Sequence, residues 1–159
     1  MATRSGNGRR RLAAVVVAAS SALLVAPAAH AEVSTSHTVH RTGATGPCAL
    51  PRPPEESIQD YSKDLIRCAA AQWPVPGGAA RAICVARRES GLVPTTSSPG
   101  GAYVGLFQHL ASAWQERYQE WTDPGWGLKD DPLNGRTNTI VTIRMVNADG
   151  WAPWSGTGC

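Results

Sequence analysis

The sequence predicts a mainly α-helical domain held by disulfides, within a chain of 159 residues. Three observations support this fold class. Apolar residues recur at helical spacing in segments that begin near residues 57, 79, 106 and 131. No segment shows the apolar–polar alternation of a confident strand. The four cysteines follow an N-terminal segment typical of export signals, and exported chains favour disulfides. A chain of this length fits one domain.

The N-terminal segment has the three parts of a secretory signal. Four arginines precede an apolar stretch at residues 12–25, and Ala29 and Ala31 supply a small-x-small cleavage pattern. We therefore expect a signal peptide at residues 1–31 and a secreted, extracellular or cell-wall-associated protein. The adjacent arginines also permit a twin-arginine signal. A retained membrane anchor is the alternative, but the apolar run is short for a spanning helix. No stable membrane insertion is expected after cleavage.

The charge of the chain excludes some partner classes. The formal net charge of +3 comes from 15 Lys and Arg against 12 Asp and Glu, and four of the arginines lie in the expected signal peptide. The remaining chain is close to neutral and has no basic stripe for nucleic acid or an anionic membrane surface. We expect no nucleic-acid partner, and the domain is expected to be a monomer.

The cysteines suggest disulfides rather than a metal site. Cys48, Cys68, Cys84 and Cys159 are an even number in an exported chain, which predicts two bridges, but spacing does not choose among the pairings. No C-x-x-C pair is present and His109 stands alone, so no metal and no cofactor are expected. Residues 32–54 are rich in Ser, Thr, Pro and Gly and predict a flexible leader, which leaves residues 55–159 as the folded domain.

The first three helices follow from apolar periodicity. We expect the first at residues 57–72, with acidic residues near its N-terminus, and the second at residues 79–90. A third is expected to run from Leu106 to about Glu120, because residues 106, 107, 110, 113 and 114 are apolar.

The last helix is expected to be the most buried one. Asp131 suggests an N-cap, with Pro132 at the first helical position, and Gly150 is expected to end the helix. Its apolar residues form a near-continuous run, which is typical of a central helix. Between the second and third helices, residues 92–106 form a turn-rich loop with room for a small hairpin. Loops of this length inside a domain are often functional.

Glu89 is the candidate catalytic residue. Ala82, Val85, Ala86 and Glu89 share one helical stripe, and Gly91 ends the helix directly after it. A carboxyl group at the edge of a core has a raised pKa, because burial disfavours its charged form. Such a group can donate a proton near neutral pH. The alternative is an ordinary surface acid.

The absence of other acids in the sequence that follows Glu89 suggests a site with one carboxylate. No Asp or Glu occurs between Glu89 and Glu116. Glycosidases usually use two carboxylates, so a lone acid favours proton donation to a leaving group, with the second role taken by water or by the substrate.

Two motifs resemble the signature of a known family. Residues 89–94 read Glu-Ser-Gly-Leu-Val-Pro, and residues 105–108 read Gly-Leu-Phe-Gln. This pattern resembles the SLT-type lytic transglycosylases of the lysozyme-like superfamily, over about residues 81–154. The resemblance implies a lysozyme-like helical domain with a loop or small hairpin beside the catalytic helix. It also implies cleavage of peptidoglycan glycan strands between N-acetylmuramic acid and N-acetylglucosamine.

The resemblance assigns roles to individual residues. Glu89 matches the single catalytic acid, which protonates the glycosidic oxygen and then acts as a base. Ser90 matches the serine that orients the acid and the sugar, and Gly105 and Gln108 match the motif that lines the glycan cleft. The family's later tyrosine-containing motif is only partly present, because Val146 stands where the tyrosine would be. Hydrolysis by water, as in lysozymes, therefore stays open beside internal attack by the muramoyl 6-hydroxyl.

Two alternatives of other classes also remain. One is a glycan-binding or regulatory module on the same fold with little turnover. The other is a secreted inhibitor or effector that uses the disulfide scaffold alone, which leaves both motifs unexplained.

Aromatic residues supply further candidates for sugar contacts, because sugar faces stack on aromatic rings. Trp126 and Trp151, each beside a glycine, are the cleft candidates, whereas Trp114 and Trp154 are expected in the core. Tyr103, in the loop after Glu89, is expected either to contact sugar or to pack.

For the remaining polar residues near the motifs we expect structural or solvent-exposed positions. His109 is expected to be packed or solvated rather than a base, and a cap on its helix is the alternative role for Gln108. Arg87 and Arg88 are expected to be solvated or paired with acids.

The resemblance also favours one disulfide pairing. Animal-type lysozymes, in the same superfamily, place a helix cysteine five residues before the catalytic acid and bridge it to the C-terminal region. Cys84 stands at that offset from Glu89. This analogy favours Cys84–Cys159 and leaves Cys48–Cys68.

Overall fold

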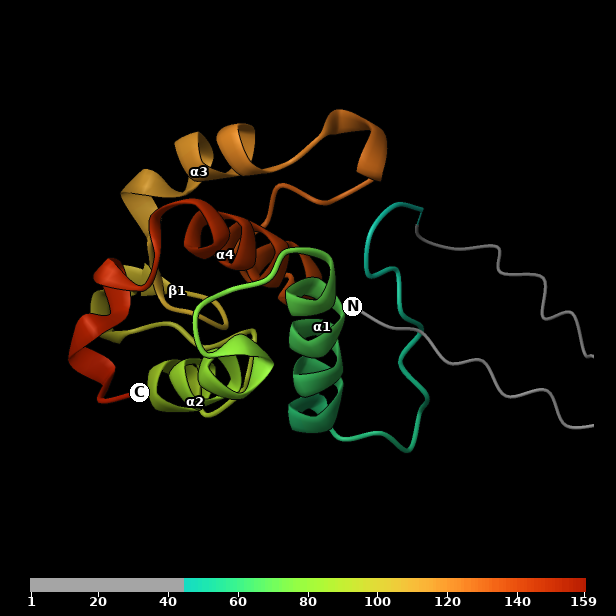
Figure 1. The fold of residues 1–159 in the computed structure, drawn as a ribbon, viewed down its shortest axis with the longest axis horizontal. Coiled ribbons are helices and arrows are strands. Elements are labelled where there is room, and N and C mark those ends of the chain that lie inside the picture. Colours follow the sequence, from blue (N-terminus) through green and yellow to red (C-terminus); the bar gives the residue numbers. More distant parts are fainter. Residues whose placement is uncertain (1–44) are drawn as a thin grey trace, which may run out of the picture. The chain divides into compact units, whose positions relative to one another are not determined.

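The computed structural model describes residues 45–159. The expected signal peptide and the first part of the expected leader, up to residue 44, lie outside the described residues. Within them, the chain forms four α-helices and one short hairpin (Figure 1). The fold is mainly helical, as the sequence predicts.

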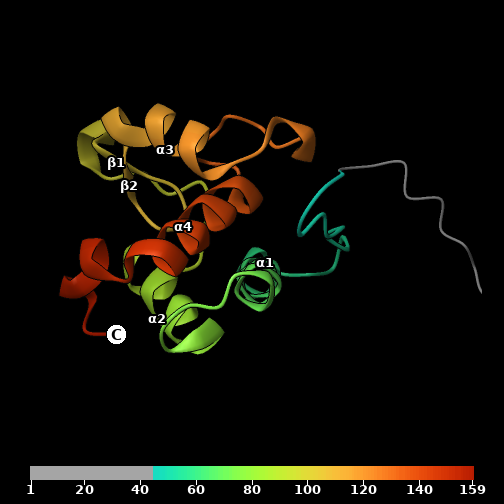
Figure 2. The same ribbon diagram turned by 45° about the horizontal axis from the view of Figure 1, so that its top comes forward.

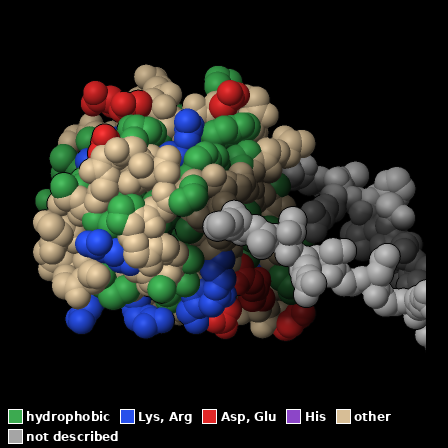
Figure 3. Space-filling model, in the orientation of Figure 1, with side chains coloured by type: hydrophobic (Ala, Val, Ile, Leu, Met, Phe, Trp, Pro, Cys, Tyr) green, Lys and Arg blue, Asp and Glu red, His purple; other side chains and the backbone are tan. Residues whose placement is uncertain are grey.

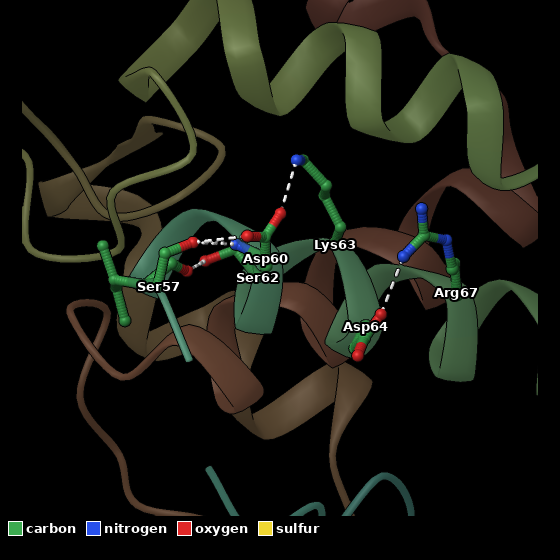
Figure 4. Close-up of polar contacts among 7 residues, drawn as sticks. Ser57, Asp60, Ser62, Lys63, Asp64 and Arg67 are labelled. Atoms are coloured by element: carbon green, nitrogen blue, oxygen red, sulfur yellow. Dashed lines mark hydrogen bonds and ion pairs between the residues drawn. The ribbon is translucent and has the colours of Figure 1, made fainter. Parts of the chain in front are cut away.

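Helix α1 (Ile58–Gln72) begins at a side-chain cap. The Ser57 hydroxyl accepts a hydrogen bond from the Asp60 backbone N–H at 3.0 Å and donates to the Asp60 carboxylate at 2.7 Å. Lys63–Asp60 and Arg67–Asp64 ion pairs, both at 2.7 Å, lie along its solvent-facing side (Figure 4). Exposed pairs of this kind contribute little to stability. The helix is therefore held mainly by its buried face, which carries Leu65, Ile66 and Ala69.

Helix α2 (Gly78–Ser90) packs against α1 and carries Glu89 in its last turn. Its buried stripe includes Ala82, Val85 and Ala86, as the periodicity predicts. Gly91 ends the helix in the left-handed region, at φ 64°, and its N–H reaches the carbonyl oxygens of the preceding turn. This is the C-terminal stop that a glycine provides at low conformational cost.

Helix α4 (Gly135–Asp149) is the most buried helix of the described chain, as predicted. Its start differs from the expectation. Asn134, rather than Asp131, is the N-cap, and its side chain accepts a hydrogen bond from the Thr137 N–H at 3.1 Å. The Asp131 carboxylate instead accepts from the Leu133 N–H at 2.8 Å and stabilises a turn ahead of the helix.

The predicted start of the third helix at Leu106 is wrong. Residues 105–108 form the turn of a hairpin between β1 (Tyr103–Val104) and β2 (His109–Leu110), and α3 (Trp114–Trp121) begins later. Gly105 and Gln108 both have positive φ values, of 84° and 48°, which a helix does not permit. The small hairpin expected in this region is present.

The α4 helix lies between α3 on one side and α1 and α2 on the other, as Figures 1 and 2 both show. The two disulfides are Cys48–Cys68 and Cys84–Cys159, the pairing that the resemblance favoured. The second bridge joins α2 to the end of the described chain, beyond the short 3-10 segment η4 (Ala152–Thr157).

The described part of the expected leader is attached to the helical body. Cys48 is buried and bridged to α1, and the Tyr61 hydroxyl donates to the Leu50 carbonyl oxygen at 3.0 Å. Arg136 on α4 donates to the carbonyl oxygens of Thr45 and Pro47. The folded body therefore begins before residue 55.

The surface of the described residues mixes both charge signs. On the face drawn in Figure 3, Lys and Arg side chains lie mainly along the edge near α1 and α2, whereas Asp and Glu side chains lie both beside them near α1 and along the opposite edge near α3. Of the helices in residues 45–159, none combines the length and the apolar character that crossing a membrane requires.

Candidate active site around Glu89

Glu89 lies half-buried in the last turn of α2, where the sequence places it. Burial raises the pKa of its carboxyl group above the ordinary value of 4.5, and no charged neighbour contributes to the shift. The protonated form is therefore favoured to a higher pH than in a solvated glutamate. This is the electrostatic condition for a proton donor.

A depression of about 370 Å³ lies directly at Glu89. One wall comes from the end of α2, through Arg88 and Glu89. The opposite wall comes from η4, about 65 residues further along the chain, and it consists of Pro153, Trp154, Gly156 and Thr157. Glu89 is the only acid among these lining residues. The depression therefore has one proton donor and no second carboxylate of its own.

Ser90 fastens the end of α2 to the hairpin turn. It is buried, and its hydroxyl lies 3.0 Å from the Ala86 carbonyl oxygen and 2.8 Å from that of Leu106. Ser90 is not among the residues that line the depression. Its hydroxyl thus orients the helix end that carries Glu89 and is occupied by backbone acceptors.

The hairpin turn is held from several sides. Gly105 approaches Asn138 and the Pro132 carbonyl so closely that an added Cβ would collide with both. The Phe107 N–H donates to the Asn138 side-chain oxygen at 3.0 Å, and the Trp154 indole N–H donates to the Phe107 carbonyl at 2.8 Å. Gly105 therefore serves close backbone packing.

Gln108 supports the same turn. Its side-chain amide donates to the carbonyl oxygens of Thr96, at 3.0 Å, and Gly105, at 2.9 Å. It does not cap a helix, and neither Gln108 nor Gly105 lines the depression at Glu89. Both residues shape the loop behind the site.

The two tryptophans expected in a cleft, Trp126 and Trp151, lie outside the depression at Glu89. Trp151 is buried, its indole N–H donates to the Pro76 carbonyl at 2.7 Å, and it does not line the depression. Trp126 packs 5.7 Å from the Trp73 ring and lies under the Arg144 guanidinium, at 5.0 Å. Neither indole lines the depression, because contacts with other parts of the fold occupy both.

Tyr103 is 50% exposed and pairs across the hairpin with Leu110, which is 40% exposed. It does not line the depression. Trp114 and Trp154 are buried, as expected.

Trp154, in addition, forms part of the wall opposite Glu89. Sequence reasoning assigned it to packing alone and did not single out Asn138. The signal that could have found Trp154 is the tryptophan- and glycine-rich stretch in which it lies.

His109 is packed rather than available as a base. Its ring is buried, with Nε2 2.7 Å from the Thr142 hydroxyl and Nδ1 2.9 Å from the Arg117 guanidinium. Because a guanidinium only donates, Nδ1 is the acceptor and Nε2 carries the proton. Burial, aided by Arg117, lowers the pKa of His109 to about 3, so the ring is neutral.

Other parts of the described chain are weaker candidates for a functional site. Residues 45–159 contain no group of three or more His, Cys, Asp or Glu side chains placed to hold a metal. A second depression, of about 220 Å³, lies near the start of α4 beside Tyr61 and Arg136. The Arg136 guanidinium is occupied there by hydrogen bonds to the backbone carbonyls of Thr45 and Pro47. The Glu89 depression is therefore the better candidate site.

The fold and site define a mainly helical, disulfide-bonded protein with a single half-buried acid in an open depression. Comparison of the chain with protein-family models, curated proteins and solved structures finds no match.

Proposed function

We propose that this protein is a lytic transglycosylase that cleaves peptidoglycan glycan strands between N-acetylmuramic acid and N-acetylglucosamine, with Glu89 as its acid and base. The observation that carries the proposal is the half-buried Glu89 carboxyl, whose pKa is raised by burial in a depression that no other acid lines. The resemblance of residues 89–94 and 105–108 to the SLT-type family supplies the substrate class.

In this mechanism, Glu89 donates its proton to the glycosidic oxygen as the bond from the muramoyl C1 breaks. The resulting carboxylate then takes a proton from the muramoyl 6-hydroxyl, whose oxygen forms the new bond to C1. The products are a 1,6-anhydro end and a strand with a free 4-hydroxyl. A single acid suffices, because the substrate supplies the nucleophile and Glu89 is returned to its protonated form.

Substitution of Glu89 by Gln tests the assignment. The amide keeps the shape of the side chain but carries no transferable proton, so glycan cleavage should fall by a factor of about 100 or more. Cleavage is measured as release of soluble fragments from purified cell-wall sacculi. Unchanged release would refute the role of Glu89. Strand binding without release by the unaltered protein would favour a binding module instead.

Mass analysis of the released fragments separates transglycosylation from hydrolysis. Internal attack leaves 1,6-anhydromuramoyl ends, whereas attack by water leaves reducing ends that are heavier by one water molecule. We expect anhydro ends. Reducing ends that disappear with Glu89→Gln would keep the acid and replace the transglycosylase by a lysozyme-type hydrolase.

A further inference from the structure

Arg88 lies beside Glu89 at the same depression. Consecutive residues on a helix point about 100° apart, so the Arg88 and Glu89 side chains leave the helix in different directions. Burial alone raises the pKa of the Glu89 carboxyl group. The depression therefore presents one acid and one separate cation.

Arg88 has no acidic partner among the described residues. The ion pairs formed within residues 45–159 are Lys63–Asp60 and Arg67–Asp64, and neither reaches α2. The rest of the depression's lining is uncharged: Pro153, Trp154, Gly156 and Thr157. The exposed Arg88 guanidinium is thus the only positive charge on the wall of the site, and its donors are free to meet a ligand.

A purely structural role does not distinguish Arg88 from its neighbour. A basic side chain in the last turn interacts favourably with the helix dipole, but Arg87 occupies that last turn as well. Arg87 is also exposed, yet it does not line the depression. The two arginines therefore share charge, helix position and exposure and differ in their access to the site. Arg87 is the matched control for any effect of Arg88 on ligands.

We propose that Arg88 binds a carboxylate of the ligand and so makes the depression selective for acidic glycan strands over neutral ones. This inference rests on the proposed function. A guanidinium binds carboxylate through two parallel hydrogen bonds, which an uncharged sugar hydroxyl does not match. In peptidoglycan the carboxylate comes either from the peptide stem or, where the stem has been removed, from the lactyl group of the muramoyl residue.

The test measures binding of defined oligosaccharides in a Glu89→Gln background, which prevents turnover. Isothermal titration compares the added changes Arg88→Gln, Arg88→Lys and Arg87→Gln on three ligands of equal sugar number. These are strands with peptide stems, stem-free strands with lactyl carboxylates, and neutral N-acetylglucosamine oligomers. The two acidic ligands identify which carboxylate is bound.

Arg88→Gln should weaken binding of at least one acidic ligand about tenfold, because a hydrogen bond to a charged group is lost. Arg88→Lys should recover part of this loss, and Arg87→Gln should change the affinity less than about twofold. Any binding of the neutral oligomer should be the same in all three variants. When Arg88→Gln is made with Glu89 intact, steady-state kinetics on acidic strands should show a raised KM with little change in kcat.

Two results would overturn the inference. One is an equal effect of Arg87→Gln and Arg88→Gln on the acidic ligands, and the other is an equal loss on acidic and neutral ligands. Failure of the proposed function is recognised separately, because it appears as full sacculus cleavage by Glu89→Gln or as no cleavage by the unaltered protein. If Glu89→Gln abolishes cleavage and Arg88→Gln leaves the affinity for the acidic ligands unchanged, this inference is refuted while the proposed function stands.

Discussion

Glu89 takes its chemical character from the point at which α2 ends. The apolar stripe of the helix draws the residue toward the core, and the Gly91 stop leaves its carboxyl group at the edge of that core. One turn earlier, Val85 and Ala86 are buried in the core, so a carboxyl group there would be fully enclosed. The raised pKa of Glu89 is thus a consequence of helix length as much as of residue type.

The raised pKa of Glu89 has a consequence for stability. A carboxyl group whose pKa is higher in the folded state than in the unfolded state favours folding at low pH, and this contribution is lost as pH rises through the folded pKa. Glu89→Gln removes the cost of charging the group. The variant should therefore be more stable than the Glu89 protein at pH 7, with the difference shrinking below about pH 4. Thermal unfolding across pH measures this, and a constant difference would contradict it.

His109 should make the fold sensitive to acid. Its pKa is lowered to about 3 by burial, from 6.5 in the unfolded chain. Stability from the neutral ring is fully present above pH 6.5 and is lost as pH falls toward 3, by about 1 kcal/mol per pH unit. The direct measurement is NMR of the His109 ring, which should not titrate between pH 8 and pH 5. A midpoint near 6.5 would show that the ring is not held neutral.

At the scale of elements, the hairpin turn at residues 105–108 is fixed by the pieces of structure around it. Ser90 holds it from α2, Asn138 from α4 and Trp154 from η4. Trp154 also lines the depression at Glu89. The turn therefore links the acid-bearing helix to the opposite wall, and its residues act on the site through packing.

A pair of glycines tests how tightly this turn is packed. Gly105 and Gly101 both have positive φ, at 84° and 71°, so alanine is strained at either position. At Gly101 the added Cβ meets nothing within 4 Å, whereas at Gly105 it collides with Asn138 and Pro132. We expect Gly101→Ala to cost about 1 kcal/mol and Gly105→Ala about 3 kcal/mol. Denaturant unfolding measures both, and equal losses would show that the approach to α4 is unimportant.

The sequence predicts the helices well where periodicity and stop signals agree. The expected ranges 57–72 and 79–90 lie within one residue of α1 and α2, α2 ends at the expected Gly91 stop, and the buried character of α4 follows from its apolar run. The failures have physical causes. Apolar residues 106 and 107 point into the core from a turn and mimic a helical stripe, and Asp131 caps a turn with the same side-chain geometry that caps a helix.

Only the part of the candidate site that lies on α2 could be predicted from the sequence. Glu89 and its stripe lie within one helix, so spacing alone places them together. Trp154 and Thr157 reach the depression through tertiary folding of a distant segment, for which no local pattern exists. The position of Trp151 away from the depression could not be predicted for the same reason, because the Pro76 carbonyl that accepts its indole N–H lies 75 residues away in the sequence.

For the molecule as a whole, the two disulfides should differ in what their loss affects. Cys84–Cys159 closes a separation of 75 residues and Cys48–Cys68 one of 20, so paired Cys→Ser changes should cost about 4 and about 3 kcal/mol respectively. Removal of Cys84–Cys159 also frees the segment that carries η4. Cleavage should then fall well below that of the Cys48–Cys68 variant under conditions where both remain folded. Equal activities would show that η4 keeps its place without the bridge.

The Cys84–Cys159 bridge also sets an order in time. A ribosome makes the chain from its amino end, so Glu89 is synthesised long before Trp154, and for that interval the acid has no opposing wall. The depression forms only after the η4 segment has been synthesised, and the Cys84–Cys159 bridge then ties that segment to α2. Every nascent chain that stops short of this segment carries the proton donor without the depression around it.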